Sequence, residues 1–315
     1  MNQNVPLVTT SDAWTRVADR VAGQQWPVAT LYVVATPIGN LGDLSLRAWQ
    51  ALVCADVIAA EDTRASRTLL DAWGVGTPLM AAHRHNEASA AQAICERLEQ
   101  GQRVALISDA GAPAVSDPGA RIVRAVREAG YGVVPVPGPS AVITALMGSG
   151  VTTNENPAYA FAGFTPSKSA ARVRWLRSWC ALPAPILMFE SPHRLAASLA
   201  DLLEVCGPAR LVTVARELTK RFEEICTFTL AESKAWLQAD AHREQGEFVL
   251  IVHAPAVIET AHEDIDPLTD VLLDALLETL SLRDAAKVAA KVTGIPRDVL
   301  YARALARRKT DAVSD

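Results

Sequence analysis

Short apolar runs alternate with longer amphipathic segments from residue 31 of this chain onward. The first four runs are rich in β-branched residues, as buried parallel strands are, and lie at 31–35, 57–60, 104–107 and 133–136. The amphipathic segments between them lie near 44–54, 63–72, 88–100 and 120–129. Because parallel strands require crossover connections, this alternation predicts an α/β fold with a parallel sheet and helices on both faces.

Two breaks divide the rest of the chain. Residues 148–157 are turn-rich, and a second α/β region follows, with strands expected at 159–162, 186–189, 211–215, 225–229 and 248–252. The second break is at 261–267, and the chain beyond it has a helical pattern. We therefore expect a poorly ordered N-terminal extension at 1–29, α/β domains at 30–150 and 158–257, and a small helical, basic domain at 265–315.

The composition is that of a globular enzyme in a reducing compartment. The chain has 315 residues, half of them hydrophobic and 21% charged, which is enough for two cores. Its five cysteines are scattered and never spaced Cys-x-x-Cys, so we expect reduced thiols in a cytoplasm. Without an apolar run of ~18–20 residues we expect no membrane partner. The His83-x-His85 pair lacks further ligands at metal-site spacing, so we expect no metal.

The charge of −5 is unevenly distributed along the chain. Residues 282–309 carry a net charge of +6, which leaves −11 for the remainder. Ser281 and Asp284 form a capping-box pattern ahead of a helix over 285–292, and a second helix is expected from Arg297 after a turn at 293–296. This resembles a helix-turn-helix unit, for which RNA contact and packing within a dimer are both open readings.

The loop at 108–119 carries the clearest ligand signal. It follows a predicted buried strand, where α/β sheets hold ligands, and it is made of small residues with two carboxylates, Asp109 and Asp117. It lacks both the Gly-x-Gly-x-x-Gly pattern and the lysine of phosphate-binding loops. These features favour a nucleoside without a phosphate, such as the positively charged S-adenosylmethionine.

Other predicted strand ends carry polar residues that also have plain structural explanations. Glu61 and Arg64 follow the second strand, where Asp62 or Thr63 should cap the next helix. Ser140 begins a helix after Pro139, and Glu190 ends a strand in the second region. Alone, each reads as a turn, a cap or a surface ion pair.

In combination, the motifs resemble the ribosomal RNA small subunit methyltransferase I family of the tetrapyrrole-methylase class. The residues that carry the resemblance span 31–254 in order and are Thr36-Pro-Ile-Gly-Asn-Leu41, Ala60-Glu-Asp-Thr-Arg64, His85-Asn-Glu87, Ser108-Asp-Ala-Gly111 with Asp117-Pro-Gly119, Pro135-Val-Pro-Gly-Pro139, Glu190-Ser191 with His193-Arg194, and Ala215-Arg-Glu-Leu-Thr-Lys220. The basic helical tail is similar to the family's small C-terminal domain. Residues 1–29 have no obvious counterpart.

The resemblance implies S-adenosylmethionine-dependent 2′-O-methylation of a cytidine ribose in the decoding region of 16S ribosomal RNA, by a homodimer. It implies a cofactor cleft between two α/β domains, lined by Pro37, Asp109, Ala110, Gly111, Val115, Ser116, Ser140, Ala141, Phe189, Glu190, Ala215, Glu217 and Glu247. Between the two aspartates of the loop, we expect Asp109 to contact the cofactor and Asp117 to shape the turn.

Catalytic roles are hypotheses based on position at strand ends. Glu61, Asp62 and Glu190 are candidate general bases, and Arg64 is a candidate phosphate-positioning residue. The candidate RNA-binding residues are Arg64, Arg67, Arg297, Arg303 and Arg307, and the expected partner is 16S ribosomal RNA or the small ribosomal subunit. The alternatives are a methylase of the same class acting on a tetrapyrrole or a protein side chain, and a non-catalytic RNA-binding assembly factor.

Overall fold

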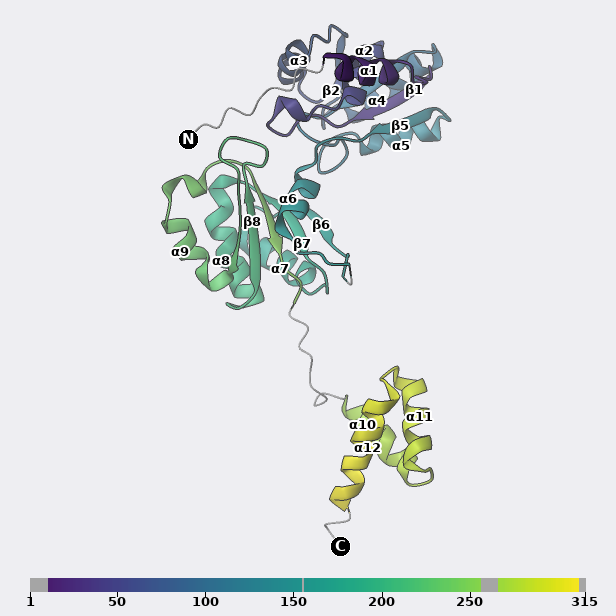
Figure 1. Ribbon diagram of the computed structural model, residues 1–315, viewed down its shortest axis with the longest axis vertical. Coiled ribbons are helices and arrows are strands. Elements are labelled where there is room, and N and C mark those ends of the chain that lie inside the picture. The colour runs from purple at the N-terminus through teal and green to yellow at the C-terminus, as the bar shows by residue number, and fades with distance from the viewer. Residues whose placement is uncertain (1–10, 155, 256–265, 312–315) are drawn as a thin grey trace. The chain divides into compact units, whose positions relative to one another are not determined.

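The computed structural model describes residues 11–154, 156–255 and 266–311, with side chains omitted at 11–12 and 306–311. The chain separates into two compact units, residues 1–255 and 256–315, which are described individually. Among these described residues, the first unit contains two five-stranded sheets and the second contains three helices (Figure 1).

The first sheet is entirely parallel, in the order β3-β2-β4-β1-β5. Its strands are β1 (Thr30–Val34), β2 (Val57–Ala60), β3 (Leu79–Ala81), β4 (Arg103–Ile107) and β5 (Gly132–Val136). Because all strands run in one direction, the loops after β1, β2, β4 and β5 emerge at the same edge of the sheet.

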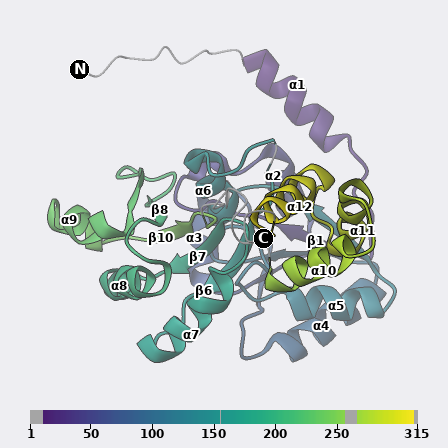
Figure 2. The ribbon, with the colours of Figure 1, turned by 90° about the horizontal axis from the view of Figure 1, so that it is seen from below.

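Helices cover both faces of the first sheet, as the alternation predicts. Alternate side chains of β1 point to opposite faces, so Tyr32 packs with α2 (Leu46–Cys54) and α3 (Thr63–Ala72). Leu31 packs on the other face with α4 (Glu87–Glu99) and α5 (Ala120–Glu128). Figure 2 shows α4 and α5 on the side of β1 away from α2.

The second sheet is mixed, in the order β6-β7-β10-β8-β9. Its strands are β6 (Ala160–Phe164), β7 (Ile186–Glu190), β8 (Leu211–Arg216), β9 (Glu224–Thr229) and β10 (Phe248–Val252). β6 and β7 are parallel, whereas β10 runs antiparallel to both β7 and β8. The start of β10 therefore lies at the same edge as the ends of β7 and β8, which brings Glu247 to that edge.

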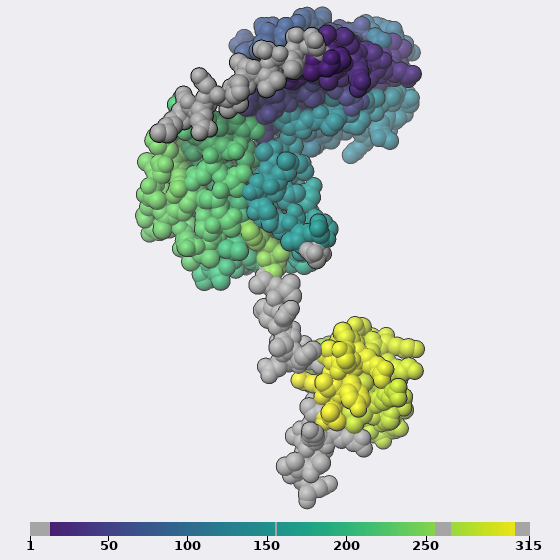
Figure 3. Space-filling view, viewed as in Figure 1, coloured from purple at the N-terminus to yellow at the C-terminus, as the bar shows by residue number. Residues whose placement is uncertain are grey.

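Three of the helices that pack on the second sheet follow its own strands in the sequence, whereas a fourth follows the last strand of the first sheet. α7 (Ser169–Trp179), α8 (Leu195–Cys206) and α9 (Ser233–Gln238) pack on the face that carries Met188 and Leu250. On the opposite face lies α6 (Ala141–Ser149), which follows β5 of the first sheet. Val142 and Ala145 of α6 are buried against Leu187 and Ile251. In the space-filling view the two halves of the first unit touch, and the outline is indented between them at one side (Figure 3).

The N-terminal extension differs in part from the expectation. Residues 1–10 lie outside the described part of the chain, and Ser11–Ala22 form a helix, α1, in place of an irregular segment. Apolar residues at helical spacing in this segment explain the helix, although Trp14 is 66% exposed. The short strand β3 was also absent from the expected strands.

The C-terminal unit is a three-helix cluster formed by α10 (Pro267–Leu277), α11 (Leu282–Thr293) and α12 (Arg297–Asp311). Ser281 caps α11, and its hydroxyl accepts a hydrogen bond from the Asp284 N–H at 3.2 Å. The core contains Leu273, Ala286, Ala289, Leu300 and Ala304. No helix in the described part of the chain combines the length and apolar character that crossing a bilayer requires.

Candidate functional site

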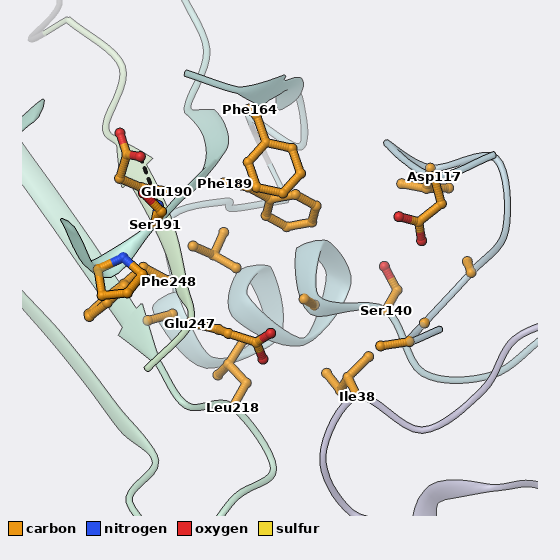
Figure 4. A pocket seen from close by; sticks show the side chains of 18 residues that line it. Ile38, Asp117, Ser140, Phe164, Phe189, Glu190, Ser191, Leu218, Glu247 and Phe248 are labelled. Atoms are coloured by element: carbon orange, nitrogen blue, oxygen red, sulfur yellow. Dashed lines mark hydrogen bonds between the residues drawn. The ribbon is translucent and has the colours of Figure 1, made fainter. Parts of the chain in front are cut away.

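A cavity of about 390 Å³ lies between the strand ends of the two sheets, a size typical of small-ligand pockets (Figure 4). The first half contributes the loops after β1, β4 and β5, and the second half contributes the ends of β6, β7 and β8 and the start of β10. The lining residues are Ile38, Ala110, Gly111, Ala112, Val115, Asp117, Ser140, Ala141, Phe164, Phe189, Glu190, Ser191, Pro192, Ala215, Leu218, Glu247, Phe248 and Val249.

The loop after β4 is held by the loop after β1. Thr36 and Gly111 form an isolated antiparallel bridge with N–H···O distances of 2.9 and 3.0 Å. Gly111 has a φ of +80°, which favours glycine, and a Cβ added there would lie 3.3 Å from Ile38 Cγ2. This wall therefore presents backbone and small side chains to a ligand.

Ala114 and Ser116, which lie farther along the same loop, have unusual backbone conformations. Ala114 has a φ of +69° and Ser116 a φ of +66°, in the left-handed region that non-glycine residues seldom occupy. Beyond them, Glu87 of α4 accepts the Gly119 N–H at 2.9 Å and the Arg121 N–H at 3.2 Å, which fixes the start of α5. Strained residues of this kind concentrate at ligand sites.

Four acidic residues meet where the loops after β2 and β4 approach each other. Asp109 accepts the Asp62 N–H at 2.9 Å, and Asp62 caps α3 by accepting the Arg64 and Ala65 N–H groups. Burial, and then the carboxylates of Asp109 and Asp117, raise the pKa of Glu61. Burial also raises the pKa of Asp117, with the Asp109 charge adding to it. Of these four acids, Asp117 lines the cavity, so the cluster lies at its edge.

Aromatic side chains form part of the second wall. The Phe164 and Phe189 rings meet edge-to-face, with centroids 5.1 Å apart. Phe164 is 57% exposed, which is unusual for a large apolar ring and typical of one that receives a ligand. In Figure 4 both rings lie across the cavity from Ile38 and Ser140.

Glu190 is buried and both its carboxylate oxygens are engaged. Its Oε1 pairs with Arg194 at 2.8 Å and accepts the Ser191 N–H at 2.7 Å. Its Oε2 accepts the hydroxyls of Thr165 and Ser198. A carboxylate with this many partners fixes the end of β7, so these contacts argue against a general-base role.

A second charged network lies at the rim next to Leu218. Lys220 Nζ bridges Glu217 Oε1 at 2.9 Å and Glu247 Oε2 at 2.7 Å. Burial alone would raise the pKa of Glu217, but hydrogen bonds from Lys220 and from the Glu247 backbone N–H lower it below its usual value. Glu217 thus faces Lys220, while Glu247 reaches the cavity.

Most of the predicted cofactor contacts come together at the cavity. Those that line it are Ala110, Gly111, Val115, Ser140, Ala141, Phe189, Glu190, Ala215 and Glu247. Pro37, Asp109, Ser116 and Glu217 lie next to lining residues in the chain but are not among them. Asp117 does line it, whereas sequence reasoning gave it only a turn-shaping role. Phe164, Leu218 and Phe248 were missed, although each lies at or next to a strand end.

The predicted RNA-binding arginines have different surroundings. Arg64 and Arg297 are exposed. Arg67 donates to the Thr77 and Val75 carbonyls and pairs with Asp71, so it holds the α3–β3 turn. Arg303 makes a two-pronged pair with Asp270 at 3.1 and 2.8 Å. The side chain of Arg307 lies outside the described residues.

The electrostatics of the cavity restrict its ligand. None of the described residues that line it is Lys, Arg or His, whereas Asp117, Glu190 and Glu247 are acidic. The described residues also contain no group of three or more His, Cys, Asp or Glu arranged to hold a metal ion. Because Arg194 pairs with Glu190 and Lys220 pairs with Glu247, Asp117 is the lining acid that has no ion pair among the described residues. A lining with one unpaired acid and no cation suits a neutral or cationic nucleoside better than a phosphorylated one.

Comparison with known proteins gives consistent results over nearly the whole chain. The family model for "Tetrapyrrole (Corrin/Porphyrin) Methylases" matches residues 30–234, and that for "RsmI C-terminal HTH domain" matches residues 263–308. The protein named ribosomal RNA small subunit methyltransferase I in Neisseria meningitidis serogroup B is 44% identical over 92% of this chain and 96% of its own. Its namesake in Xylella fastidiosa is 45% identical over 86% of this chain and 97% of its own.

Solved structures share the architecture at low sequence identity. A uroporphyrin-III C-methyl transferase from Thermus thermophilus, solved with S-adenyl homocysteine, superposes with a TM-score of 0.50 at 17% identity. The match covers 71% of this chain and 97% of the solved one. At this identity the likeness concerns the fold alone.

Proposed function

Because this chain belongs to the ribosomal RNA small subunit methyltransferase I family, whose members methylate ribosomal RNA using S-adenosylmethionine, we propose that its acceptor is the 2′-hydroxyl of a cytidine ribose in the decoding region of 16S ribosomal RNA. The observation that carries this proposal is the cavity, whose described lining residues include no cation. Arg64 is exposed at the start of α3, which follows β2 of the first sheet. The proposal places the reaction in the cytoplasm.

The lining residues suit S-adenosylmethionine. When bound, this cofactor supplies an electrophilic methyl group on a positively charged sulfur. The backbone at 110–112 and the Ser140 hydroxyl can hydrogen-bond an unphosphorylated nucleoside, and Ser140 makes no capping bond in the described residues. Asp117 supplies negative charge for a cation, and Phe189 supplies an apolar face for a planar base.

We assign proton removal from the acceptor hydroxyl to Glu61. A general base is most effective when its pKa lies near the working pH, and burial together with neighbouring carboxylates moves the pKa of Glu61 upward in that direction. Asp62 is less suitable because it caps α3, which lowers its pKa. Arg64, exposed in the first turn of α3, would bind the phosphate next to the acceptor ribose and thereby align it.

Methyl transfer from labelled S-adenosylmethionine tests this proposal. Small ribosomal subunits, free 16S ribosomal RNA, a porphyrinoid and a bulk protein fraction are offered side by side, followed by nuclease digestion and nucleoside analysis. We expect label in 2′-O-methylcytidine alone. Label in the porphyrinoid or in protein would support another methylase of the class. RNA binding without transfer to any acceptor would support an assembly factor.

The homodimer implied by the family resemblance is also part of the proposal. α6 carries exposed apolar residues, with Met147 81% and Ile143 42% exposed, which is an unusual surface for a monomer. Light scattering should give twice the mass of the 33.7 kDa chain. A monomer at micromolar concentration would contradict the proposed homodimer but not the proposed methylation.

A further inference from the structure

A basic, aromatic pocket lies on the C-terminal unit between the starts of α11 and α12. It is lined by Arg283, Arg297, Asp298 and Tyr301, all of them exposed. All four belong to the C-terminal unit, so the pocket is complete within residues 266–311. The cavity between the two sheets of the first unit uses none of them.

A row of positively charged side chains on α11 extends from this pocket along the helix. Ala285, Ala286 and Ala289 are buried in the core of the unit, so the opposite face of α11 points to solvent. That face carries Arg283, Lys287 and Lys291, one every four residues and all exposed. At about 1.5 Å rise per residue these charges follow each other at ~6 Å intervals along the helix. The pocket therefore lies at one end of a basic stripe.

The two arginines of the pocket are available to a ligand. Within the described part of the chain, neither the Arg283 nor the Arg297 guanidinium makes a hydrogen bond or ion pair, in contrast to Arg303, which Asp270 binds with both oxygens. A guanidinium without a carboxylate partner suits a phosphate, because its planar fork can donate two parallel hydrogen bonds.

Tyr301 and Asp298 further restrict the class of ligand that the pocket can bind. Tyr301 is 40% exposed, so its ring can stack on a planar base. The Asp298 carboxylate would repel a free phosphate or an acidic peptide, but it accepts hydrogen bonds from a ribose hydroxyl or a base amine. Phosphate, planar ring and hydrogen-bond donors occur together in a ribonucleotide.

We propose that this pocket binds one nucleotide of single-stranded RNA, with Tyr301 stacked on the base, Arg283 and Arg297 on the phosphates, and the stripe of Lys287 and Lys291 on the backbone beyond. The proposal rests on the proposed function in that it assigns a second RNA contact, separate from the methyl-transfer cavity. Within α12, the proposal assigns RNA contact only to residues of the first turns, because Arg303 is paired with Asp270.

Fluorescence anisotropy with the full chain and a labelled oligouridylate tests the proposal. We expect Tyr301→Leu to weaken binding about tenfold without changing its salt dependence. The double variant Arg283→Ala/Arg297→Ala should weaken binding at low salt and reduce the slope of log K against log[salt] by about 0.7 for each phosphate that is no longer neutralised. Tyr301→Phe, which keeps the ring, and Arg124→Ala, which removes an exposed arginine from α5, should bind as wild type.

Thermal melting followed by circular dichroism verifies that each variant is folded, and Tyr301→Phe verifies that a ring suffices. Wild-type affinity and salt slope in the folded double variant would overturn the proposal, as would poly-glutamate binding that the variants lose while they retain oligouridylate. Methyl transfer at saturating small subunits distinguishes the two proposals. Its persistence in the pocket variants leaves the proposed function intact, and its absence in wild type would refute that function alone.

Discussion

Glu61, Asp109 and Asp117 are acidic residues at one edge of the first sheet, and each has a different surrounding. Asp109 ties two loops together through the Asp62 N–H, whereas Asp117 lines the cavity. Glu61 is half-buried beside both of them. Within one cluster, acidic residues therefore tie loops together, line the cavity and, in the proposed function, act as the general base.

We expect Glu61→Gln to reduce turnover about a hundredfold or more, because general bases contribute about 10²–10⁴-fold. In wild type, activity should decline as the pH falls through the raised pKa of Glu61, since protonation removes the base. Single-turnover methyl transfer from pH 5 to 8 measures this. Near-normal turnover in Glu61→Gln would show that alignment of the acceptor suffices.

Glu190→Gln is the matched comparison for that experiment. It changes a carboxylate whose oxygens bind Arg194, Ser191, Thr165 and Ser198, so its main expected effect is on unfolding. Losing an acceptor for buried hydroxyls costs about 1–3 kcal/mol. A folded Glu190→Gln protein with abolished turnover and an unchanged unfolding midpoint would contradict this assignment.

Asp117→Asn should stabilise the ligand-free protein while weakening its cofactor affinity. Burial raises the pKa of Asp117, so its charged form disfavours folding at neutral pH, and the amide removes that cost. We expect the midpoint of thermal unfolding to rise by about 2 °C at pH 7. As the pH falls through the raised pKa toward its ordinary value, wild type and variant should converge because the wild-type group becomes neutral.

Calorimetry with S-adenosylmethionine measures the second effect, which is the weaker cofactor affinity expected when the negative charge opposite the sulfonium is removed. Asp19→Asn, an exposed acidic residue on α1, is the control and should change neither quantity. Unaltered cofactor affinity in Asp117→Asn would mean that Asp117 does not face the cation.

The contact between two loops across the cavity depends on a single glycine. Gly39 has a φ of +145°, and a Cβ there would lie 2.5 Å from Lys220 Cγ. Gly39 follows Ile38, and Lys220 follows Leu218 by two residues, so both loops carry a lining residue. Close approach of the Lys220 stem therefore sets the distance between the two walls.

Gly39→Ala should weaken cofactor binding and lower the unfolding midpoint. Adding Lys220→Ala removes the clashing stem, so the double variant should be impaired by less than the sum of the single effects. Gly74→Ala is the control, because its φ of +65° imposes strain with no atom within 4 Å of the added Cβ. Additive effects in the double variant would exclude the steric coupling.

Local patterns predicted the elements more completely than their arrangement. β2 and β10 have the predicted bounds because each is a short β-branched run between polar residues, and α3 begins where Asp62 caps it. The mixed direction of the second sheet depends on pairing between distant strands, on which a strand's own residues carry little information. Glu247 was expected from family resemblance, and antiparallel β10 is what brings it to the cavity.

Single interactions between distant residues also limited the prediction of the site. The position of Arg303 in a basic helix gave no sign of Asp270, its partner 33 residues away. Asp117 was expected only to shape the turn, but it lines the cavity, directly after Ser116 with its φ of +66°. A positive φ at a serine is rare and is not predictable from residue type. Residue type and strand-end position predicted which loops reach the cavity, and tertiary packing decided which of their residues line it.

At the scale of the whole molecule, the cavity belongs to one of the two units. All its lining residues lie between 38 and 249. A chain ending at Pro255 should therefore bind S-adenosylmethionine with the wild-type dissociation constant, within about twofold, because every lining residue is retained. Calorimetry measures this, and RNA affinity should fall with removal of the basic stripe. A large drop in cofactor affinity would show that the first unit needs the second.

The position of α6 has a consequence for how this molecule can be divided. Helix α6 follows the last strand of the first sheet in sequence, but Val142 and Ala145 are buried in the second sheet's core. A gene cut in the turn-rich segment at 148–157 would leave one half without part of its interior and the other with an uncovered apolar helix. The seam at which both halves keep their own interior is 137–140, so fragment complementation or a transplanted half should begin there.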